Sequence, residues 1–90
     1  MNYKSLPYRI YFKKISVNHQ KIRSDEILGY TENFPKIDSQ FVMFSDPIDK
    51  NTDVRIINTS IVKEFLSKTK DFIVFKTESG SVYEVRILAN

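Results

Sequence analysis

The sequence predicts a mainly β protein, a small SH3-like or OB-like antiparallel barrel of five or six strands, with room for one short helical turn. The clearest signal is a β-hairpin: two β-branched and aromatic runs, 71–77 and 81–88, flank a turn at Ser79-Gly80. The composition agrees, because 7 Phe, 5 Tyr and only 2 Gly suit strands better than helices. Turn signals separate the other apolar runs, and 90 residues are the length of one domain, residues 1–90.

The first predicted strand covers residues 8–17, and its apolar side chains fall on even-numbered positions at first and on odd-numbered positions later. The first set is Tyr8, Ile10 and Phe12, and the second set is Ile15 and Val17. Because neighbouring side chains of a strand point to opposite faces, a β-bulge across Lys13-Lys14 would return both sets to one side. Two short strands with an irregular join are the alternative.

The second and third strands are expected after a polar loop at residues 18–20. Residues 22–31 fit a strand in which Gly29 permits a close approach or a bend, and a short helix capped at residues 24–26 is the less favoured alternative. After a loop at residues 33–40, the apolar run 41–44 lacks alternation, which is typical of a strand buried on both faces.

Residues 54–62 predict a β-branched strand, and its continuation has two interpretations. Apolar residues within 61–66 have helical spacing, with Ser60 as a possible cap, yet residues 57–65 also alternate as a strand. We favour the strand, followed by a turn at residues 67–70 that leads into the final hairpin. The core predicted from these elements consists of Phe41, Met43, Ile57, Ile61, Ile73, Phe75, Val82, Val85 and Ile87.

Residue chemistry argues against an enzyme and predicts no catalytic residues, no cofactor and no metal. The chain has no Cys and one His, His19, which rules out a structural zinc site. The segment 49–53 copies the start of a calcium loop, but Val54 stands where that loop needs Gly and Ser60 where it needs an acid. The two glycines lie far apart and form no phosphate-binding loop.

Targeting signals are also lacking, which predicts a cytoplasmic protein without a membrane partner. No apolar run approaches the ~20 residues of a membrane helix, and none resembles a signal peptide. A small secreted domain would often carry disulfides, so the absence of Cys favours a reducing cytoplasm.

Charge is distributed unevenly, and this is the feature that points to a function. Residues 1–24 contain six basic residues and no acid, whereas the whole chain carries a net charge of only +3. On a strand, alternate basic and aromatic residues share one face, as a protein that binds single-stranded nucleic acid would need. The candidate binding residues are Arg9, Tyr11, Lys13, Lys14, Lys21 and Arg23. The same stripe could dock an acidic patch of a protein or be ordinary solvated surface.

A series of segments between residues 26 and 87 resembles small barrel-like accessory proteins of bacteriophages and mobile elements. The segments are Glu26-Ile-Leu-Gly, Phe34-Pro-Lys, Gln40-Phe-Val-Met-Phe, Arg55-Ile-Ile-Asn-Thr-Ser-Ile-Val, Phe75-Lys-Thr and Ser81-Val-Tyr-Glu-Val. Two turns depart from the pattern, at Asp38-Ser39 and Gly80-Ser81. The resemblance implies a protein that acts by binding a host protein in the bacterial cytoplasm, as anti-CRISPR inhibitors of host defence do. A nucleic-acid-binding barrel is the alternative.

Overall fold

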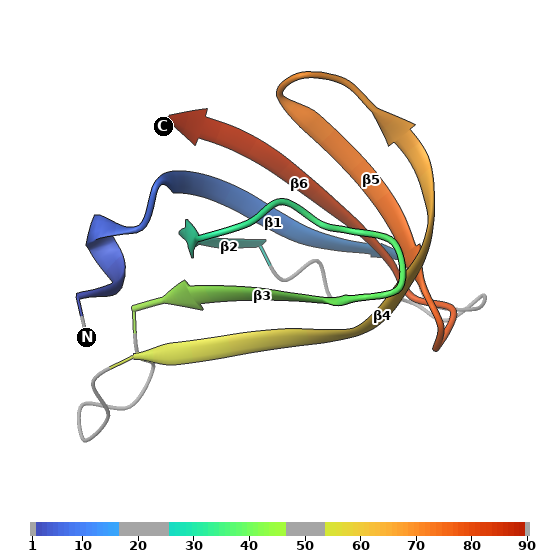
Figure 1. Ribbon diagram of the computed structural model, residues 1–90, viewed down its shortest axis with the longest axis horizontal. Coiled ribbons are helices and arrows are strands. Elements are labelled where there is room, and N and C mark those ends of the chain that lie inside the picture. Colours follow the sequence, from blue (N-terminus) through green and yellow to red (C-terminus); the bar gives the residue numbers. More distant parts are fainter. Residues whose placement is uncertain (1, 17–25, 47–53, 90) are drawn as a thin grey trace.

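The computed structural model describes residues 2–16, 26–46 and 54–89, which contain one 3-10 helix and six strands. They are η1 (Tyr3–Ser5), β1 (Tyr8–Ser16), β2 (Glu26–Thr31), β3 (Gln40–Ser45), β4 (Arg55–Lys68), β5 (Phe72–Thr77) and β6 (Val82–Ala89). Every strand pairs antiparallel with the next, and β6 pairs with β1 to close a barrel (Figure 1). This is up-and-down connectivity. The predicted small antiparallel β-barrel is confirmed.

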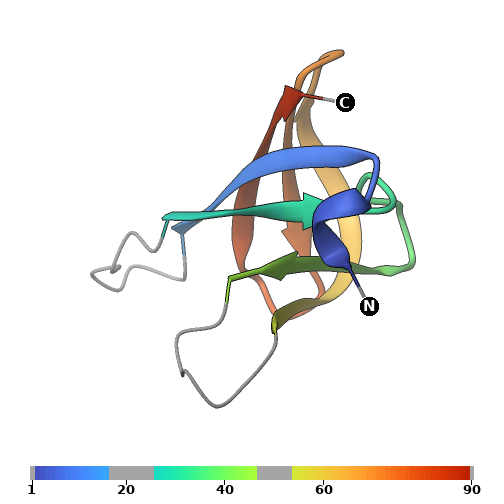
Figure 2. The same ribbon diagram turned by 90° about the vertical axis from the view of Figure 1, so that its left-hand side faces the viewer.

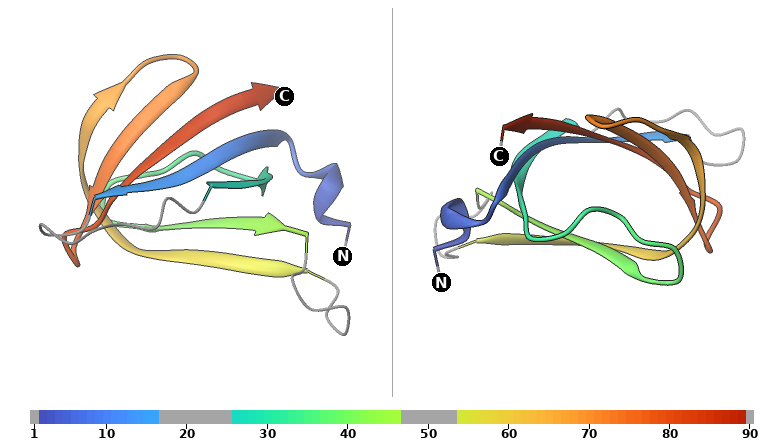
Figure 3. Two further views of the ribbon diagram at one scale, coloured as in Figure 1. Left: turned by 180° about the vertical axis from the view of Figure 1, so that it is seen from behind. Right: turned by 45° about the horizontal axis from the view of Figure 1, so that its top comes forward.

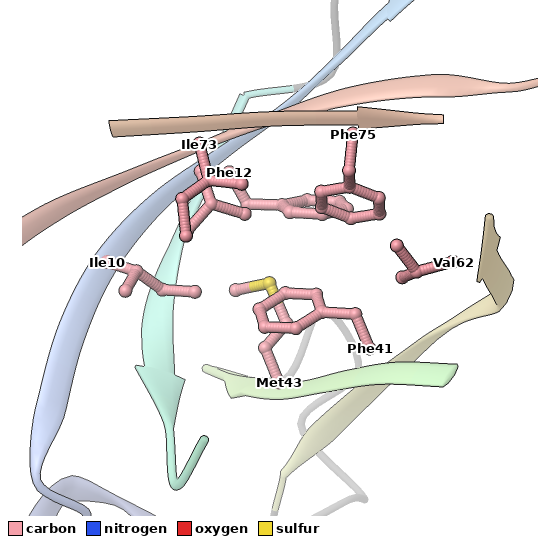
Figure 4. Close-up of a cluster of buried hydrophobic side chains, with 8 residues drawn as sticks. Ile10, Phe12, Phe41, Met43, Val62, Ile73 and Phe75 are labelled. Atoms are coloured by element: carbon pink, nitrogen blue, oxygen red, sulfur yellow. The ribbon is translucent and has the colours of Figure 1, made fainter. Parts of the chain in front are cut away.

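The strands curve around one interior, as Figures 2 and 3 show from three further directions. A single apolar cluster fills this interior. Its buried members are Ile10, Phe12, Phe41, Met43, Val62, Ile73, Phe75 and Val85. Figure 4 shows Phe75 of β5 facing Phe41 of β3 across the interior, and their ring centroids lie 5.8 Å apart. Because all strands contribute to one interior, each strand has one inward and one outward set of side chains.

The predicted core is correct for Phe41, Met43, Ile73, Phe75 and Val85, which are buried. It is correct in part for Ile57 and Ile87, which are half-buried and pack against the core cluster, and wrong for Ile61 and Val82, which are half-buried and are not part of it. A bulge explains one of these errors. Asn58 and Ile61 are three positions apart on β4, whereas their partners on β3, Val42 and Gln40, are only two positions apart, so β4 has one extra residue here. The bulge shifts the parity, so Val62 rather than Ile61 points inward.

Strand β4 is 14 residues long, so the favoured strand interpretation of residues 61–66 is confirmed and the helical alternative is wrong. Its pairing with β5 shifts register between Val62 and Glu64 and again between Phe65 and Ser67. These irregularities let one strand bend around the barrel, as the curved β4 in Figure 1 shows. The short helical turn lies instead at η1, ahead of the first strand.

Two details of β1 and β3 differ from expectation. The pairing of β1 with β6 shifts register between Lys14 and Ser16, just after the predicted bulge, but Ile15 remains 39% exposed and does not join the core. Val17 lies outside the described residues. Strand β3 is not buried on both faces, because Val42 is 37% exposed on the outside while its neighbours Phe41 and Met43 point inward.

The predicted hairpin is confirmed, and its turn depends on glycine. Strands β5 and β6 pair antiparallel, and Gly80 has a φ of 89°. The Gly80 N–H donates to the Thr77 carbonyl at 2.9 Å, and the Thr77 N–H donates to the Ser81 carbonyl at 2.9 Å. A residue with a Cβ is strained in this left-handed conformation.

We therefore expect Gly80→Val to lower the free energy of unfolding by about 1–3 kcal/mol, since Val is strained at positive φ. Gly80→Asn should lose clearly less, because Asn tolerates this conformation. Urea unfolding of the two variants measures the difference. Equal losses for Val and Asn would show that backbone conformation is not what requires Gly80.

Candidate functional site

The candidate site begins with three residues of β1 that share the outer face of the barrel. Ile10 and Phe12 point into the core, so the alternating residues Arg9, Tyr11 and Lys13 point outward. Arg9 is exposed, and Tyr11 and Lys13 are partly exposed. The shared face predicted for these three residues is therefore present.

Neighbouring strands place further side chains around this stripe. On β2, Leu28 lies opposite Tyr11 and Glu26 lies opposite Lys13, and on β6, Arg86 lies opposite Tyr11. Directly paired residues point to the same side of a sheet. Tyr11 therefore lies between Leu28, which is 56% exposed, and Arg86.

Acidic partners accompany two of the cations on this face. Lys13 Nζ lies 3.9 Å from Glu26 Oε1, and the Arg86 guanidinium donates a hydrogen bond to Glu84. Burial and the Glu26 carboxylate raise the pKa of Tyr11, so its phenol stays protonated. The face thus alternates positive and negative charge around an uncharged tyrosine, instead of forming a continuous cation track.

Two shallow grooves flank Arg86 on the outer side of β6. One, of about 390 Å³, is lined by Tyr11, Lys13, Glu84, Arg86 and Leu88. The other, of about 470 Å³, is lined by Asp71, Phe72, Arg86, Ile87 and Leu88. The Arg86 guanidinium carbon lies 4.9 Å from the Phe72 ring centroid, a cation–π distance that holds the side chain between the grooves. Leu28, Phe72, Arg86 and Leu88 are the members of this face that sequence reasoning missed.

The other end of the same face, beside Arg9, carries two tyrosines. Tyr30 on β2 lies opposite Arg9, and Tyr3 of η1 packs edge-on against Tyr30 with ring centroids 6.0 Å apart. The Tyr3 hydroxyl donates a hydrogen bond to Asp46, which raises the pKa of Tyr3 to about 12. This contact ties η1 to the end of β3.

Lys14 does not join the stripe. Lys14 lies on the same side of β1 as the core residues Ile10 and Phe12, and its Nζ lies 5.8 Å from the ring centroid of Tyr83. Tyr83 stacks on Phe12 at 5.1 Å between centroids, so Lys14 covers the aromatic core instead of extending the outer face. The predicted binding residues Lys21 and Arg23 lie outside the described residues, as do His19 and the segment 49–53.

Within the described ranges, no group of three His, Cys, Asp or Glu side chains could hold a metal ion. In the same ranges, no helix has the length and apolar character needed to cross a membrane. Comparisons with protein-family models, curated proteins and solved structures find no significant match to this chain. The fold defines the class of the protein, which is a small six-stranded antiparallel β-barrel.

Proposed function

We propose that this chain is a non-enzymatic binding protein of the phage or mobile-element accessory class. It acts in the bacterial cytoplasm, where it binds and inhibits a host protein such as a defence protein. The binding surface is the outer face of β1, β2 and β6, centred on Tyr11 and hereafter called the Tyr11 face. The observation that carries the proposal is the alternation of charge around a partly exposed Tyr and exposed Leu and Arg side chains on this face.

The composition of the Tyr11 face suits a folded protein as partner. Tyr and Arg are among the residue types enriched at the centre of protein interfaces, and Leu28 and Leu88 add apolar area beside them. The paired charges Lys13–Glu26 and Arg86–Glu84 can match a surface of complementary pattern, which specifies a partner more than it adds affinity.

A nucleic-acid-binding barrel is the second candidate, supported by the contiguous stripe of Arg9, Tyr11 and Lys13. Such a stripe could combine a phosphate contact with base stacking on the ring. The acids Glu26 and Glu84 count against it, because they flank the stripe and would repel phosphates.

Affinity purification from a lysate of the host bacterium, with and without nuclease, tests which class of partner is bound. We expect a host protein to be retained after nuclease treatment, with a dissociation constant that depends weakly on salt. Loss of the complex on nuclease treatment would instead indicate nucleic acid. In that case the logarithm of the association constant should fall steeply and linearly with the logarithm of the salt concentration.

We expect Tyr11→Ala to weaken binding of that partner about thirtyfold, the effect of losing a central interface residue worth about 2 kcal/mol. The matched control is Leu66→Ala, which truncates another exposed apolar side chain, on β4 away from the Tyr11 face. Leu66→Ala should leave the dissociation constant within about twofold. Calorimetric titration with the purified partner gives both constants.

Charge reversal provides an independent test of the same surface. Arg9→Glu with Lys13→Glu should slow association, while Lys36→Glu with Lys70→Glu, which changes the net charge equally at other exposed sites, should not. Exposed charges contribute little to stability, so both double variants should remain folded. Equal association rates for the two would show that position on the Tyr11 face is irrelevant, and the proposed surface would be wrong.

A further inference from the structure

Strand β3 has a nearly complete pairing on one side and almost none on the other. Five of its residues have partners on β4, but only Phe44 has a partner on β2, namely Tyr30. The chain after β2, residues 32–39, is irregular, and Figure 1 shows it running along the barrel before it turns back into β3. The ladder of the barrel is therefore interrupted beside the first half of β3.

Hydrogen bonds show which backbone groups of β3 face this interruption. The Phe41 N–H donates to Thr59 Oγ1 at 3.1 Å, and the Ser39 carbonyl accepts from the Val62 N–H at 2.9 Å, so both point toward β4. Since backbone groups alternate along a strand, those of Gln40 and Val42 point to the opposite side.

Most of these groups lack a partner within the described chain. The Val42 carbonyl accepts a hydrogen bond from Thr31 Oγ1 at 2.8 Å. For the Val42 N–H and for the N–H and carbonyl of Gln40, the described ranges contain no backbone hydrogen bond to residues 32–36. They form a short free strand edge, the kind of edge to which another strand can add.

A groove lies directly on this edge. It has a volume of about 280 Å³, and its lining includes Asn33 and Phe34 on one side and Gln40, Phe41 and Val42 on the other. The half-buried side chains of Phe34 and Phe44 offer an apolar floor, and the side-chain amides of Asn33 and Gln40 can bond to a peptide backbone. The volume is at the lower limit for a small-molecule site, but it suits a side chain anchored by a paired backbone.

We propose that the edge of β3 at Gln40 and Val42 is a second binding surface, which accepts an extended segment of a partner protein by β-strand addition. The segment pairs its backbone with Gln40 and Val42 and packs an apolar side chain against Phe34 and Phe44. Free backbone donors and acceptors recognise an extended chain of any sequence, and the apolar floor selects the side chain. This surface is separate from the Tyr11 face and does not depend on it.

The test uses a random heptapeptide display library, selected on the wild-type protein and depleted on Val42→Pro. Proline removes the Val42 N–H, which forms no bond within the barrel, so the fold should survive. Val42→Thr is the matched control, because it keeps the N–H and the β-branched shape. We expect a selected, synthesised peptide to lose about tenfold or more in affinity for Val42→Pro, and to bind Val42→Thr within about twofold.

Two measurements do not depend on the protein variants. Amide exchange of Gln40 and Val42, read by nuclear magnetic resonance, should slow on peptide binding, while the amides of Arg9 and Tyr11 stay unchanged. A copy of the peptide methylated on its alternate backbone nitrogens should not bind, because it cannot form the ladder. Failure to select any peptide, or equal binding of the methylated copy, would overturn the proposal. If amide exchange of Gln40 and Val42 slowed when the protein concentration was raised without peptide, the edge would bind a second copy of this chain. That result would also overturn the proposal.

Discussion

Gly29→Ala should destabilise the barrel by about 3 kcal/mol or more, the upper end of what overpacking a close-packed site costs. A Cβ built at Gly29 would overlap the carbonyl oxygen of Phe44 and lie 2.6 Å from Met43 Cε. The Met43 methyl ends a flexible side chain and can move, but the Phe44 oxygen belongs to the backbone of the neighbouring strand. The strands β2 and β3 must therefore separate to admit even one methyl group.

This contact lies where the barrel is held by few backbone bonds. Side-chain hydroxyls help to join β2 and β3: Ser45 Oγ donates to the Leu28 carbonyl at 2.8 Å, and Thr31 Oγ1 donates to the Val42 carbonyl at 2.8 Å. Both bonds require the close approach that Gly29 permits. Separating the strands would break them as well, which adds to the cost of the Gly29→Ala change.

Urea unfolding of Gly29→Ala, beside Leu28→Ala as control, measures the effect. Leu28 is the neighbouring residue but points outward, so truncating it should change the free energy of unfolding by less than about 1 kcal/mol. A midpoint for Gly29→Ala equal to that of Leu28→Ala would mean that β2 and β3 can separate at little cost. The close approach of β2 and β3 at Gly29 would then not contribute to the stability of the barrel.

Sequence patterns predicted the strands because each strand signal is local. The hairpin has strand-forming flanks and a Gly at its turn, and the alternation in β4 identified a strand where helical spacing competed. What the patterns did not give is the effect of bulges on which side chains point inward. The parity of Ile61 and of Ile15 depends on how β4 pairs with β3 and β1 with β6, and a register across strands is set by packing that no single segment reveals.

The same limit applies to the candidate site. Alternation along β1 correctly placed Arg9, Tyr11 and Lys13 on one face. The acids that neutralise this face come from β2 and β6, and Glu84 is far from Lys13 in the sequence although they are paired in the sheet. The predicted basic stripe is therefore a mixed-charge surface, which favours the protein partner that we propose over the nucleic-acid alternative.

Phe75→Ala should be the most damaging truncation in the core, at about 3–5 kcal/mol, a large share of the stability of so small a domain. Phe75 has an exposed fraction of 0%, and its ring centroid lies 5.8 Å from that of Phe41 and 5.5 Å from that of Tyr83. Removing the ring leaves a cavity between β3, β5 and β6, and it also ends two aromatic contacts that add to the burial.

Two further variants separate burial from ring loss. Phe75→Leu keeps most of the volume, so it should cost much less than Phe75→Ala. Phe72→Ala removes a ring from the same strand, but Phe72 points outward beside Arg86 and is only half-buried. We expect its unfolding midpoint in urea to stay close to that of the wild type. If Phe72→Ala and Phe75→Ala lost equal stability, the inward parity of β5 would be wrong, and with it the register that places Arg86 on the Tyr11 face.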